Sequence, residues 1–341
     1  MALVCANCGG TFPRLGQVPI LLADARSRLT TLAAALGARR GSLNAERETL
    51  AQSALDPRLR FRAAALEQRR QGLLRNRALL EDELGDLLES VMRSGGPSPA
   101  GEAPAIGESF GEGDTSALFT DWSLSPEAER EIETVCALAR EMAGPPPASL
   151  DGRALFLGAG VGRHAVELGR AFRSALAIDL SVDRMWLFNQ VLHRPLEFAA
   201  FEDGAPLIRD GLTRLVRTEP PPAVAGLRLA VADARRLPVS DASVSHVFSI
   251  YFTDMIPLAE LLPEVARVLA PDGTFVHVGP LHYAFRDAAW RLAPDELPEA
   301  FRQFGFEIQG QREQSLELGH SSASGLELHY RALVFRARRI P

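Results

Sequence analysis

An apolar run gives way to three alternating glycines in Leu155-Phe-Leu-Gly-Ala-Gly-Val-Gly-Arg163, which leads directly into a helical pattern. Glycine has no Cβ, so a strand-to-helix turn built on it passes close under a ligand. The next apolar run ends in an acidic residue, Asp179, seventeen residues after Gly162. A carboxylate about 20 residues beyond such a turn is placed to bind a ribose, next to the N–H groups that open the helix. We therefore expect the site of a nucleoside-containing cofactor at this turn.

The composition is that of a globular protein: 341 residues, 46% hydrophobic, 23% charged, with a net charge of −6. This length accommodates about two domains. The basic side chains form no stripe interleaved with aromatic residues, so we do not expect a nucleic-acid partner. No apolar run approaches the ~18 residues of a membrane span, and the N-terminus lacks the pattern of an export signal. We expect a cytoplasmic protein with no membrane partner.

Three cysteines, Cys5, Cys8 and Cys136, are too few and too odd in number for a disulfide framework. Cys5 and Cys8 are spaced like half of a zinc-ribbon knuckle, but a closed structural site needs four ligands and no second pair follows. We expect two free thiols and no metal. A site completed by a second subunit is the alternative.

Helical periodicity covers the N-terminal region, which we bound at residues 1–94. The pattern predicts one helix from Val18 to Leu36 with Gly37 as its C-cap, and a short second helix over 44–55. Asp56-Pro57 is typical of an N-cap followed by an N1 proline, and predicts a long third helix. Leucines recur there every seven residues and predict a packing seam, either within a helical hairpin or between two chains of a homodimer: Leu59, Leu66, Leu73, Leu80 and Leu87.

Residues 95–117 are rich in Gly, Pro, Glu and Ser, which indicates a flexible linker or a lid. In the remaining domain, 118–341, strands alternate with helices and predict a mostly parallel sheet covered on both faces. Ser125-Pro126 caps a helix over 127–142, and residues 195–226 form a loose segment. The expected strands are 154–157, 175–178, 227–230, 247–250 and 274–278, followed by an antiparallel pair at 306–311 and 330–336. One expected helix runs from the glycine turn to about residue 172, and the others cover 181–192, 258–269 and 294–304.

A glycine turn alone suits NAD, FAD or S-adenosylmethionine, and three further features favour S-adenosylmethionine. Asp233 and Ala234 follow the third strand, where the Asp233 carboxylate can accept a hydrogen bond from the adenine amino group. The fourth strand ends in a polar segment, Tyr251-Phe-Thr-Asp254. The Pro-Asp-Gly turn at 271–273 resembles the one in class I methyltransferases. Asp179 and Asp233 also have a simpler interpretation, as caps of the following helices.

The chain from Leu118 onward resembles a known family in five segments: Phe119-Thr-Asp-Trp-Ser123 with Glu129-Arg130, Leu157-Gly-Ala-Gly-Val-Gly-Arg163, Tyr251-Phe-Thr-Asp254, Val278-Gly-Pro-Leu-His-Tyr-Ala-Phe285 and His329-Tyr-Arg-Ala-Leu-Val-Phe335. This family is the carnosine N-methyltransferases. The resemblance covers about two-thirds of the chain and leaves the N-terminal helices outside. It implies a Rossmann-like class I methyltransferase fold, an α/β domain with a seven-stranded sheet and helices on both faces, preceded here by an α-helical region.

The resemblance also implies transfer of a methyl group to an imidazole nitrogen of a histidine-containing small molecule or peptide. Asp254 would orient the imidazole ring, with helix capping as its simpler interpretation. The implied catalytic residues are Asp254, Tyr283 and Tyr330, and Trp122 and His282 join them around the acceptor. The implied cofactor-binding residues are Gly158, Ala159, Gly160, Gly162, Arg163, Asp179, Asp233, Ala234 and Tyr251.

Two positions depart from the family's pattern. Met255 stands where the family has a histidine, and Ala284 replaces another, with His282 nearby instead. Both lie on the acceptor side, so the sequence leaves open an acceptor other than carnosine. The alternatives are an oxygen, carbon or sulfur acceptor, or a degenerate methyltransferase fold that serves as an interaction module. We expect His164, just after the glycines, on the surface of its helix.

Overall fold

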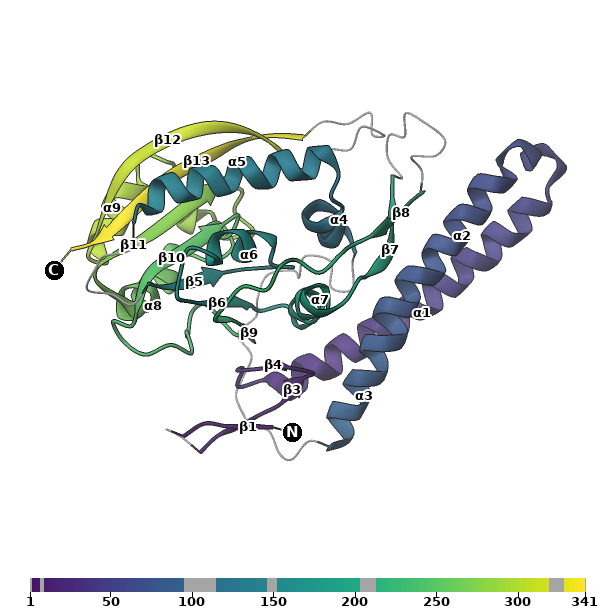
Figure 1. Ribbon diagram of the computed structural model, residues 1–341, viewed down its shortest axis with the longest axis horizontal. Helices are drawn as coiled ribbons and strands as arrows, with labels where there is room; N and C mark the ends of the chain where they lie inside the picture. Colours follow the sequence, from purple (N-terminus) through teal and green to yellow (C-terminus); the bar gives the residue numbers. More distant parts are fainter. Residues whose placement is uncertain are drawn as a thin grey trace.

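The molecule is built around a seven-stranded sheet with a long helical hairpin projecting from one side, as seen in a computed structural model (Figure 1). The structure describes residues 2–6, 9–94, 115–145, 152–202, 213–318 and 328–340. Cys8 and most of the expected linker, residues 95–114, lie outside the described residues. The predictions for the Cys5–Cys8 pair and for the linker as a lid therefore stay predictions.

The sheet has the order β12-β13-β11-β10-β5-β6-β9. Neighbouring strands are parallel from β11 to β9, whereas β13 pairs antiparallel with both β11 and β12. This confirms the expected α/β fold with a reversed strand at the end. The strands are β5 (Arg153–Leu157), β6 (Ser174–Asp179), β9 (Leu227–Val231), β10 (Val244–Ile250), β11 (Leu269–Gly279), β12 (Phe306–Leu318) and β13 (Leu328–Arg339).

Helices cover both faces because successive strand residues point to opposite sides. Phe156 and Phe248 pack in one apolar cluster together with the helices α5 (Pro126–Ala143), α6 (Arg163–Gly169) and α7 (Val182–His193). Leu155 and Val247 belong to a second cluster with α8 (Leu258–Val268) and α9 (Leu297–Gln303). The strands are therefore apolar on both sides, as expected of a buried parallel sheet.

Two predicted helix starts are confirmed by their caps. The Ser125 hydroxyl accepts a hydrogen bond from the Ala128 N–H at 3.2 Å, at the start of α5. The Asp56 carboxylate accepts one from the Arg58 N–H at 2.8 Å. Asp56 opens a 3-10 turn (Pro57–Arg62) that continues into α2 (Ala63–Arg77), a π-helical turn (Ala78–Leu84) and α3 (Gly85–Ser94).

The prediction of a C-cap at Gly37 is wrong. One continuous helix, α1 (Ala25–Leu55), passes through this position and takes in the two helices expected at 18–36 and 44–55. Val18 and Pro19 instead form a short strand, β4, which pairs with β3 (Arg14–Leu15). Tertiary packing overrides the helix-breaking tendency of glycine here, because Leu36 and Leu43 on either side are buried.

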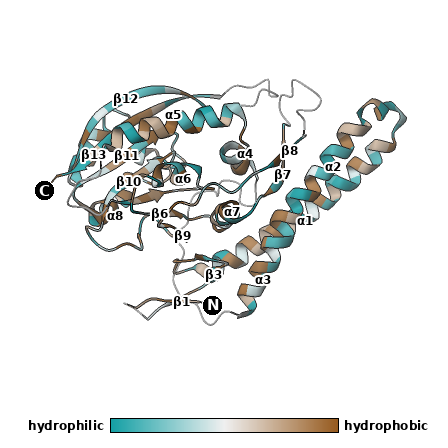
Figure 2. Cartoon of the chain, viewed as in Figure 1, coloured by the Kyte–Doolittle hydropathy of each residue, from teal (hydrophilic) through white to brown (hydrophobic). Residues whose placement is uncertain are grey.

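The helical hairpin packs against itself through the leucine seam. Leu80 is fully buried and belongs to the same apolar cluster as Leu29 and Leu32 of α1. Leu73 is also buried, whereas Leu59, Leu66 and Leu87 are partly buried. Hydrophobic and hydrophilic segments alternate along both long helices (Figure 2). The intramolecular alternative accounts for the seam, and a homodimer through these helices stays a prediction.

The base of the hairpin joins the sheet at its β9 edge. Ile20 forms a parallel bridge with Val231, and the Leu21 N–H donates to the Val231 carbonyl at 2.8 Å. The short strands β1 (Leu3–Val4) and β2 (Thr11–Phe12) precede this point. The N-terminal region therefore continues the hydrogen bonding of the sheet.

The segment expected to be loose contains a second small sheet, which corrects that prediction. Strands β7 (Glu197–Phe201) and β8 (Thr213–Arg217) pair antiparallel, with Ala199 opposite Leu215. Pro and charged residues concealed the strands in the sequence, and their stability comes from packing against α2. Gly72 of α2 permits this close approach, because a Cβ there would lie 2.7 Å from the Ala199 Cβ.

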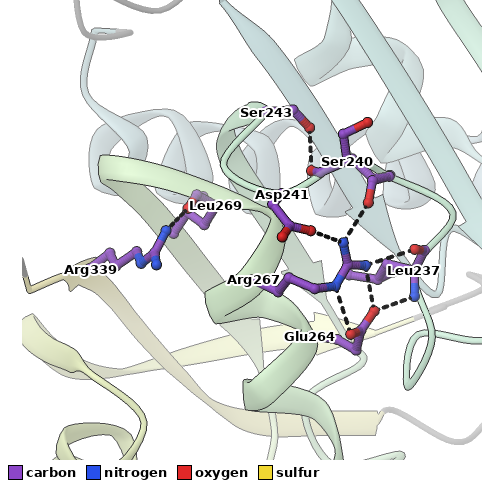
Figure 3. Close-up of polar contacts among 9 residues, drawn as sticks. Leu237, Ser240, Asp241, Ser243, Glu264, Arg267, Leu269 and Arg339 are labelled. Carbon is purple, nitrogen blue, oxygen red and sulfur yellow. Dashed lines mark hydrogen bonds and ion pairs between the residues drawn. The ribbon is translucent and has the colours of Figure 1, made fainter.

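A partly exposed ion network ties α8 to the loop before β10 (Figure 3). The Arg267 guanidinium bonds both oxygens of Glu264 at 2.7 and 2.8 Å, and donates to the carbonyls of Leu237 and Val239. Hydrogen bonding to Glu264 raises the pKa of Arg267, so the charge is permanent. The loop at the amino end of β10 is thus fixed. It lies at the edge opposite the carboxyl ends of the parallel strands, where ligands bind in open α/β sheets.

We expect Leu80→Ala to lower the free energy of unfolding by about 2–5 kcal/mol, the usual loss for a fully buried leucine. Leu59→Ala, at a partly buried position of the same seam, serves as the matched control and should cost clearly less. Urea unfolding followed by circular dichroism measures both. Equal losses at the two positions would contradict packing of the seam inside one chain.

Candidate functional site

The glycine loop between β5 and α6 adopts a backbone that only glycine takes readily. Gly158, Gly160 and Gly162 all have positive φ, at 59°, 56° and 86°. A Cβ on Gly158 would lie 2.1 Å from the ring of Phe252, and one on Gly162 would lie 2.0 Å from the ring of Phe188. At Gly160 a Cβ would meet no atom within 4 Å. The loop is therefore packed against protein at both ends and open at its middle glycine.

Asp179 lies at the carboxyl end of β6 and anchors this loop. Its Oδ2 accepts a hydrogen bond from the Gly160 N–H and its Oδ1 accepts one from the Ser181 N–H, both at 2.8 Å. Burial raises the pKa of Asp179, and these two hydrogen bonds oppose the rise. The cap expected for the next helix is present as well, but Ser181 provides it by accepting from the Arg184 N–H. Each Asp179 oxygen retains a second lone pair for a ribose hydroxyl.

Asp233 follows β9 and is paired with Arg235. The guanidinium bonds both carboxylate oxygens, with the shortest contact at 2.8 Å, and the Arg235 N–H donates to Oδ1. Burial pushes the pKa of Asp233 up, but the hydrogen bonds from Arg235 outweigh it and the pKa lies below its usual range. Ala234 beside it is buried. Asp233 is therefore ionised, with Arg235 competing for its oxygens.

Arg163 faces helices rather than the open side of the loop. Its guanidinium contacts Glu129 at 3.0 Å and Glu167 at 3.3 Å, and donates to the Asp121 carbonyl. It also lies 5.1 Å from the Trp122 ring. Two carboxylates already balance its charge, so in this arrangement Arg163 holds α5 and α4 (Ser116–Trp122) against the loop.

Trp122 is buried and contacts the glycine loop. Its Nε1–H donates to the Val161 carbonyl at 2.8 Å. The sequence predicted that Trp122 closes over an acceptor. The structure places it on the cofactor loop instead, at the end of a helix that begins at Ser116, inside the range expected for the linker.

An acidic pair that the sequence did not indicate, the buried Glu131 and the partly buried Asp121, lies beside Tyr251. The Tyr251 hydroxyl donates to Glu131 Oε1 of α5 at 3.2 Å, and the Asp121 carboxyl lies near enough to act on its pKa. Burial raises the pKa of Tyr251 well above its usual value, and Glu131 adds to the rise. Burial also raises the pKa of Asp121 to about 7, with Glu131 adding and Arg163 opposing. In the sequence, Glu131 could have been singled out only by its helical spacing, which places it on the same face of α5 as the buried Ala128 and Val135.

His164 is not on the helix surface, which corrects the prediction. It lines a small pocket between β5, β10 and α6 together with Gly158 and Ala159. Its ring meets the Tyr251 ring edge-on at 5.9 Å, and its Nε2 is buried with no hydrogen-bond partner among the described residues. Burial, with the nearby Arg163 charge, lowers the pKa of His164 to about 4. The imidazole is therefore neutral at physiological pH.

Asp254 is buried after β10 and organises the segment that follows β11. Its Oδ2 accepts a hydrogen bond from the His282 N–H at 2.7 Å, and its carbonyl accepts one from the Ala284 N–H. Burial raises the pKa of Asp254. It does not cap α8, whose N-cap is Pro257. The structure thus joins the two acceptor segments expected from the sequence.

The three tyrosines occupy different parts of this region. Tyr283 donates its hydroxyl to the Leu292 carbonyl at 2.6 Å and packs on Phe285. Tyr330 lies in β13, opposite Leu316 of β12, and is partly buried. The side chain of His282 is exposed. Tyr251 bonds Glu131, while Tyr283 is turned toward its own loop.

A family model described as a methyltransferase domain matches residues 208–277. A curated relative, the malonyl-[acyl-carrier protein] O-methyltransferase of Methylococcus capsulatus, is 32% identical over 192 residues, covering 54% of this chain and 56% of that protein. This chain therefore spans just over half the length of that relative. Similar solved structures include an S-adenosylmethionine-dependent methyltransferase from Methanosarcina mazei, with 17% identity, coverage of 56% of this chain and 93% of that one, and a TM-score of 0.39. Another is from Aquifex aeolicus, with 14% identity, coverage of 67% of this chain and 94% of that one, and a TM-score of 0.39.

The strand order, the glycine loop and the matched segment are those expected of a class I S-adenosylmethionine-dependent methyltransferase domain, whose cofactor is S-adenosylmethionine. The comparisons match a methyltransferase domain over part of the chain, and the narrower resemblance to carnosine N-methyltransferases stays a prediction. Among the described residues, no helix combines the length and apolar character needed to cross a bilayer.

The residues at the loop fit this cofactor. Gly160 is open on one side, and the Asp179 carboxylate lies directly behind it at the end of β6. The cofactor-binding roles expected of Gly158, Ala159, Gly160, Gly162, Arg163, Asp179, Asp233, Ala234 and Tyr251 stay predictions.

We expect Gly160→Val to weaken binding of S-adenosylhomocysteine by about a hundredfold, equivalent to about 3 kcal/mol. The side chain has room within the protein but enters the space where the ligand is expected. Its backbone cost of about 1–2 kcal/mol lowers stability only modestly. Titration calorimetry measures the affinity. Gly305→Val is the control, since Gly305 has a φ of +78° and equally open surroundings far from the loop. Equal affinities in both variants would exclude this loop as the site.

We expect Asp121→Asn to stabilise the protein more at about pH 8 than at about pH 5. The pKa of Asp121 rises from 3.8 to about 7 on folding, so the folded state binds the extra proton and stability falls as pH increases between these values. The amide removes this loss. Thermal unfolding at both pH values measures the gain, with the exposed Asp295→Asn as control. The same gain at both pH values would argue against a buried, protonated Asp121.

Proposed function

We propose that the protein uses S-adenosylmethionine to methylate an imidazole nitrogen of a histidine-containing small molecule or peptide. The observation that carries this proposal is the buried Glu131 carboxylate, which accepts a hydrogen bond from the Tyr251 hydroxyl at the carboxyl end of β10, with Asp121 close by. Buried carboxylates favour a reacting group that gains positive charge and disfavour one that arrives with a negative charge. A neutral nitrogen acceptor satisfies both conditions.

S-adenosylmethionine supplies an electrophilic methyl group, and its transfer requires in-line attack by the acceptor. An imidazole with a pKa near 6.5 is largely neutral at pH 7 and can attack through one nitrogen. A carboxylate that accepts the proton on the second nitrogen orients the ring and stabilises the positive charge of the product. In this chain, the loop glycines and Asp179 would bind the donor, and the carboxylates near Tyr251 would provide that field.

Asp254 would orient the acceptor, because the His282 N–H occupies only its Oδ2. Tyr330 would line the acceptor site beside Tyr251. Tyr283 and His282 would shape the loop that closes over it, since both belong to the segment that Asp254 organises. Trp122 would act on the donor side, where it holds the loop at Val161.

A second candidate is methylation of a carboxyl oxygen. It is favoured by the relative that is named for this reaction on malonyl-[acyl-carrier protein]. An anionic acceptor of this kind would need a basic partner in place of Asp121 and Glu131. A third reading, a methyltransferase fold that only mediates interactions, predicts no binding of S-adenosylhomocysteine.

The test incubates the protein with isotope-labelled S-adenosylmethionine and a panel of histidine, carnosine, histidine-containing peptides and malonyl-[acyl-carrier protein]. Mass spectrometry then identifies any labelled product. Label on an imidazole nitrogen supports the proposal. Label only on the malonyl carboxyl would replace it with the second candidate.

We expect Glu131→Gln to lower the kcat for the imidazole acceptor about tenfold or more, the usual range for losing an electrostatic contact in a reacting site. The amide still accepts the hydrogen bond from Tyr251 but lacks the charge. Glu133→Gln, an exposed position on the same helix, should leave kcat unchanged. A Glu131→Gln enzyme as fast as the wild type would remove the electrostatic argument.

A further inference from the structure

The helix α4 connects the cofactor loop to the rest of the molecule. At its end, Trp122 bonds the Val161 carbonyl, and the Asp121 carbonyl accepts from Arg163, the residue that follows the loop. At its start, Thr115 is the N-cap, whose carbonyl accepts from the Phe119 N–H. A shift of Thr115 would therefore be passed along one short helix to the loop.

Thr115 is held by a side chain of the N-terminal hairpin. The Asn76 amide of α2 donates to the Thr115 hydroxyl at 3.1 Å and to the Ala199 carbonyl at 2.9 Å. Its Oδ1 accepts from the Ala199 N–H at 2.7 Å. Asn76 is 3% exposed and Thr115 is 5% exposed. One buried amide thus joins three elements: α2, β7 and the start of α4.

The hairpin makes other contacts with the small sheet that do not reach α4. Gln68 of α2 donates to the Thr213 carbonyl of β8 at 2.9 Å. Arg69 lies over the Phe201 ring at 4.7 Å. Asn76 differs from them because it alone, among these contacts, also binds Thr115. Such a fully bonded buried amide stabilises one arrangement of its neighbours.

We propose that Asn76 is a positioning residue for the cofactor loop, and that the N-terminal hairpin serves as the brace that sets α4 over that loop. This inference rests on the proposed function, because it assigns a purpose to the loop that the donor would occupy. It also gives the hairpin a role in donor binding rather than in acceptor choice.

The experiment compares three variants of the full chain: Asn76→Ala, Thr115→Val and Gln68→Ala. Thr115→Val removes the hydroxyl, and with it the bonds to the Asn76 amide and to the Ala199 carbonyl. It keeps the side-chain shape and the Asn76–Ala199 pair, so it tests the link of α4 to Asn76 and β7 even if Asn76→Ala folds poorly. Gln68→Ala loses a hydrogen bond from the same helix to the same small sheet but no contact with α4. S-adenosylhomocysteine is titrated by calorimetry, and thermal midpoints are recorded for each.

We expect Asn76→Ala and Thr115→Val to weaken S-adenosylhomocysteine binding about tenfold, the effect of the one buried hydrogen bond, between Asn76 and Thr115, that both variants lose. Gln68→Ala should bind as the wild type does, even where its thermal midpoint falls equally. With an active acceptor in hand, the KM for the donor should rise while kcat at saturating donor stays within about twofold of the wild type.

The outcomes distinguish a failure of the proposed function from a failure of the role assigned to Asn76. Wild-type protein that does not bind S-adenosylhomocysteine would overturn the proposed function and this inference with it. Binding by the wild type that Thr115→Val leaves unchanged would overturn the inference alone. Equal weakening in Gln68→Ala would also overturn it, because the effect would then reflect general loosening of the hairpin.

Discussion

The hydrogen bond from the Gly160 N–H to the Asp179 carboxylate is the contact around which the site is arranged. It joins the ends of β5 and β6, two strands that are neighbours in the sheet. The left-handed backbone of the glycine loop makes the contact possible, and the rings of Phe252 and Phe188 fill the space that side chains would need. The loop therefore requires glycine for packing at its two ends, whereas only its middle glycine faces open space.

Burial of acidic groups beside this loop carries a free-energy cost that the fold only partly offsets. Asp121, Asp179 and Asp254 all have raised pKa values because burial disfavours their charged forms. Backbone N–H groups and nearby arginines reduce the penalty without removing it. A cationic ligand would reduce it further, and this is the physical link between the stability of the domain and the chemistry we propose for it.

The N-terminal hairpin is part of the same structure rather than an appendage. Its base shares an apolar cluster with α7, and Ile20 extends the hydrogen bonding of β9. Its outer helix meets the β7–β8 sheet at Gly72 and Asn76. The N-terminal region thus contacts the α/β domain at two separate places, one at the β9 edge of the large sheet and one at the β7–β8 sheet.

The sequence by itself determined the α/β class, the antiparallel pair that ends the sheet, the glycine loop with its carboxylate, and the helix caps at Ser125 and Asp56, because all of these follow from local periodicity and turn chemistry. The order of the strands came from the tertiary structure. Only the tertiary structure decided that α1 runs through Gly37, that β7 pairs with β8 and that His164 lines a pocket with its Nε2 buried. It also paired Tyr251 with Glu131 and Arg163 with Glu129, which are 120 and 34 residues apart. Partner choice over such distances depends on how the layers pack, and no local pattern encodes it.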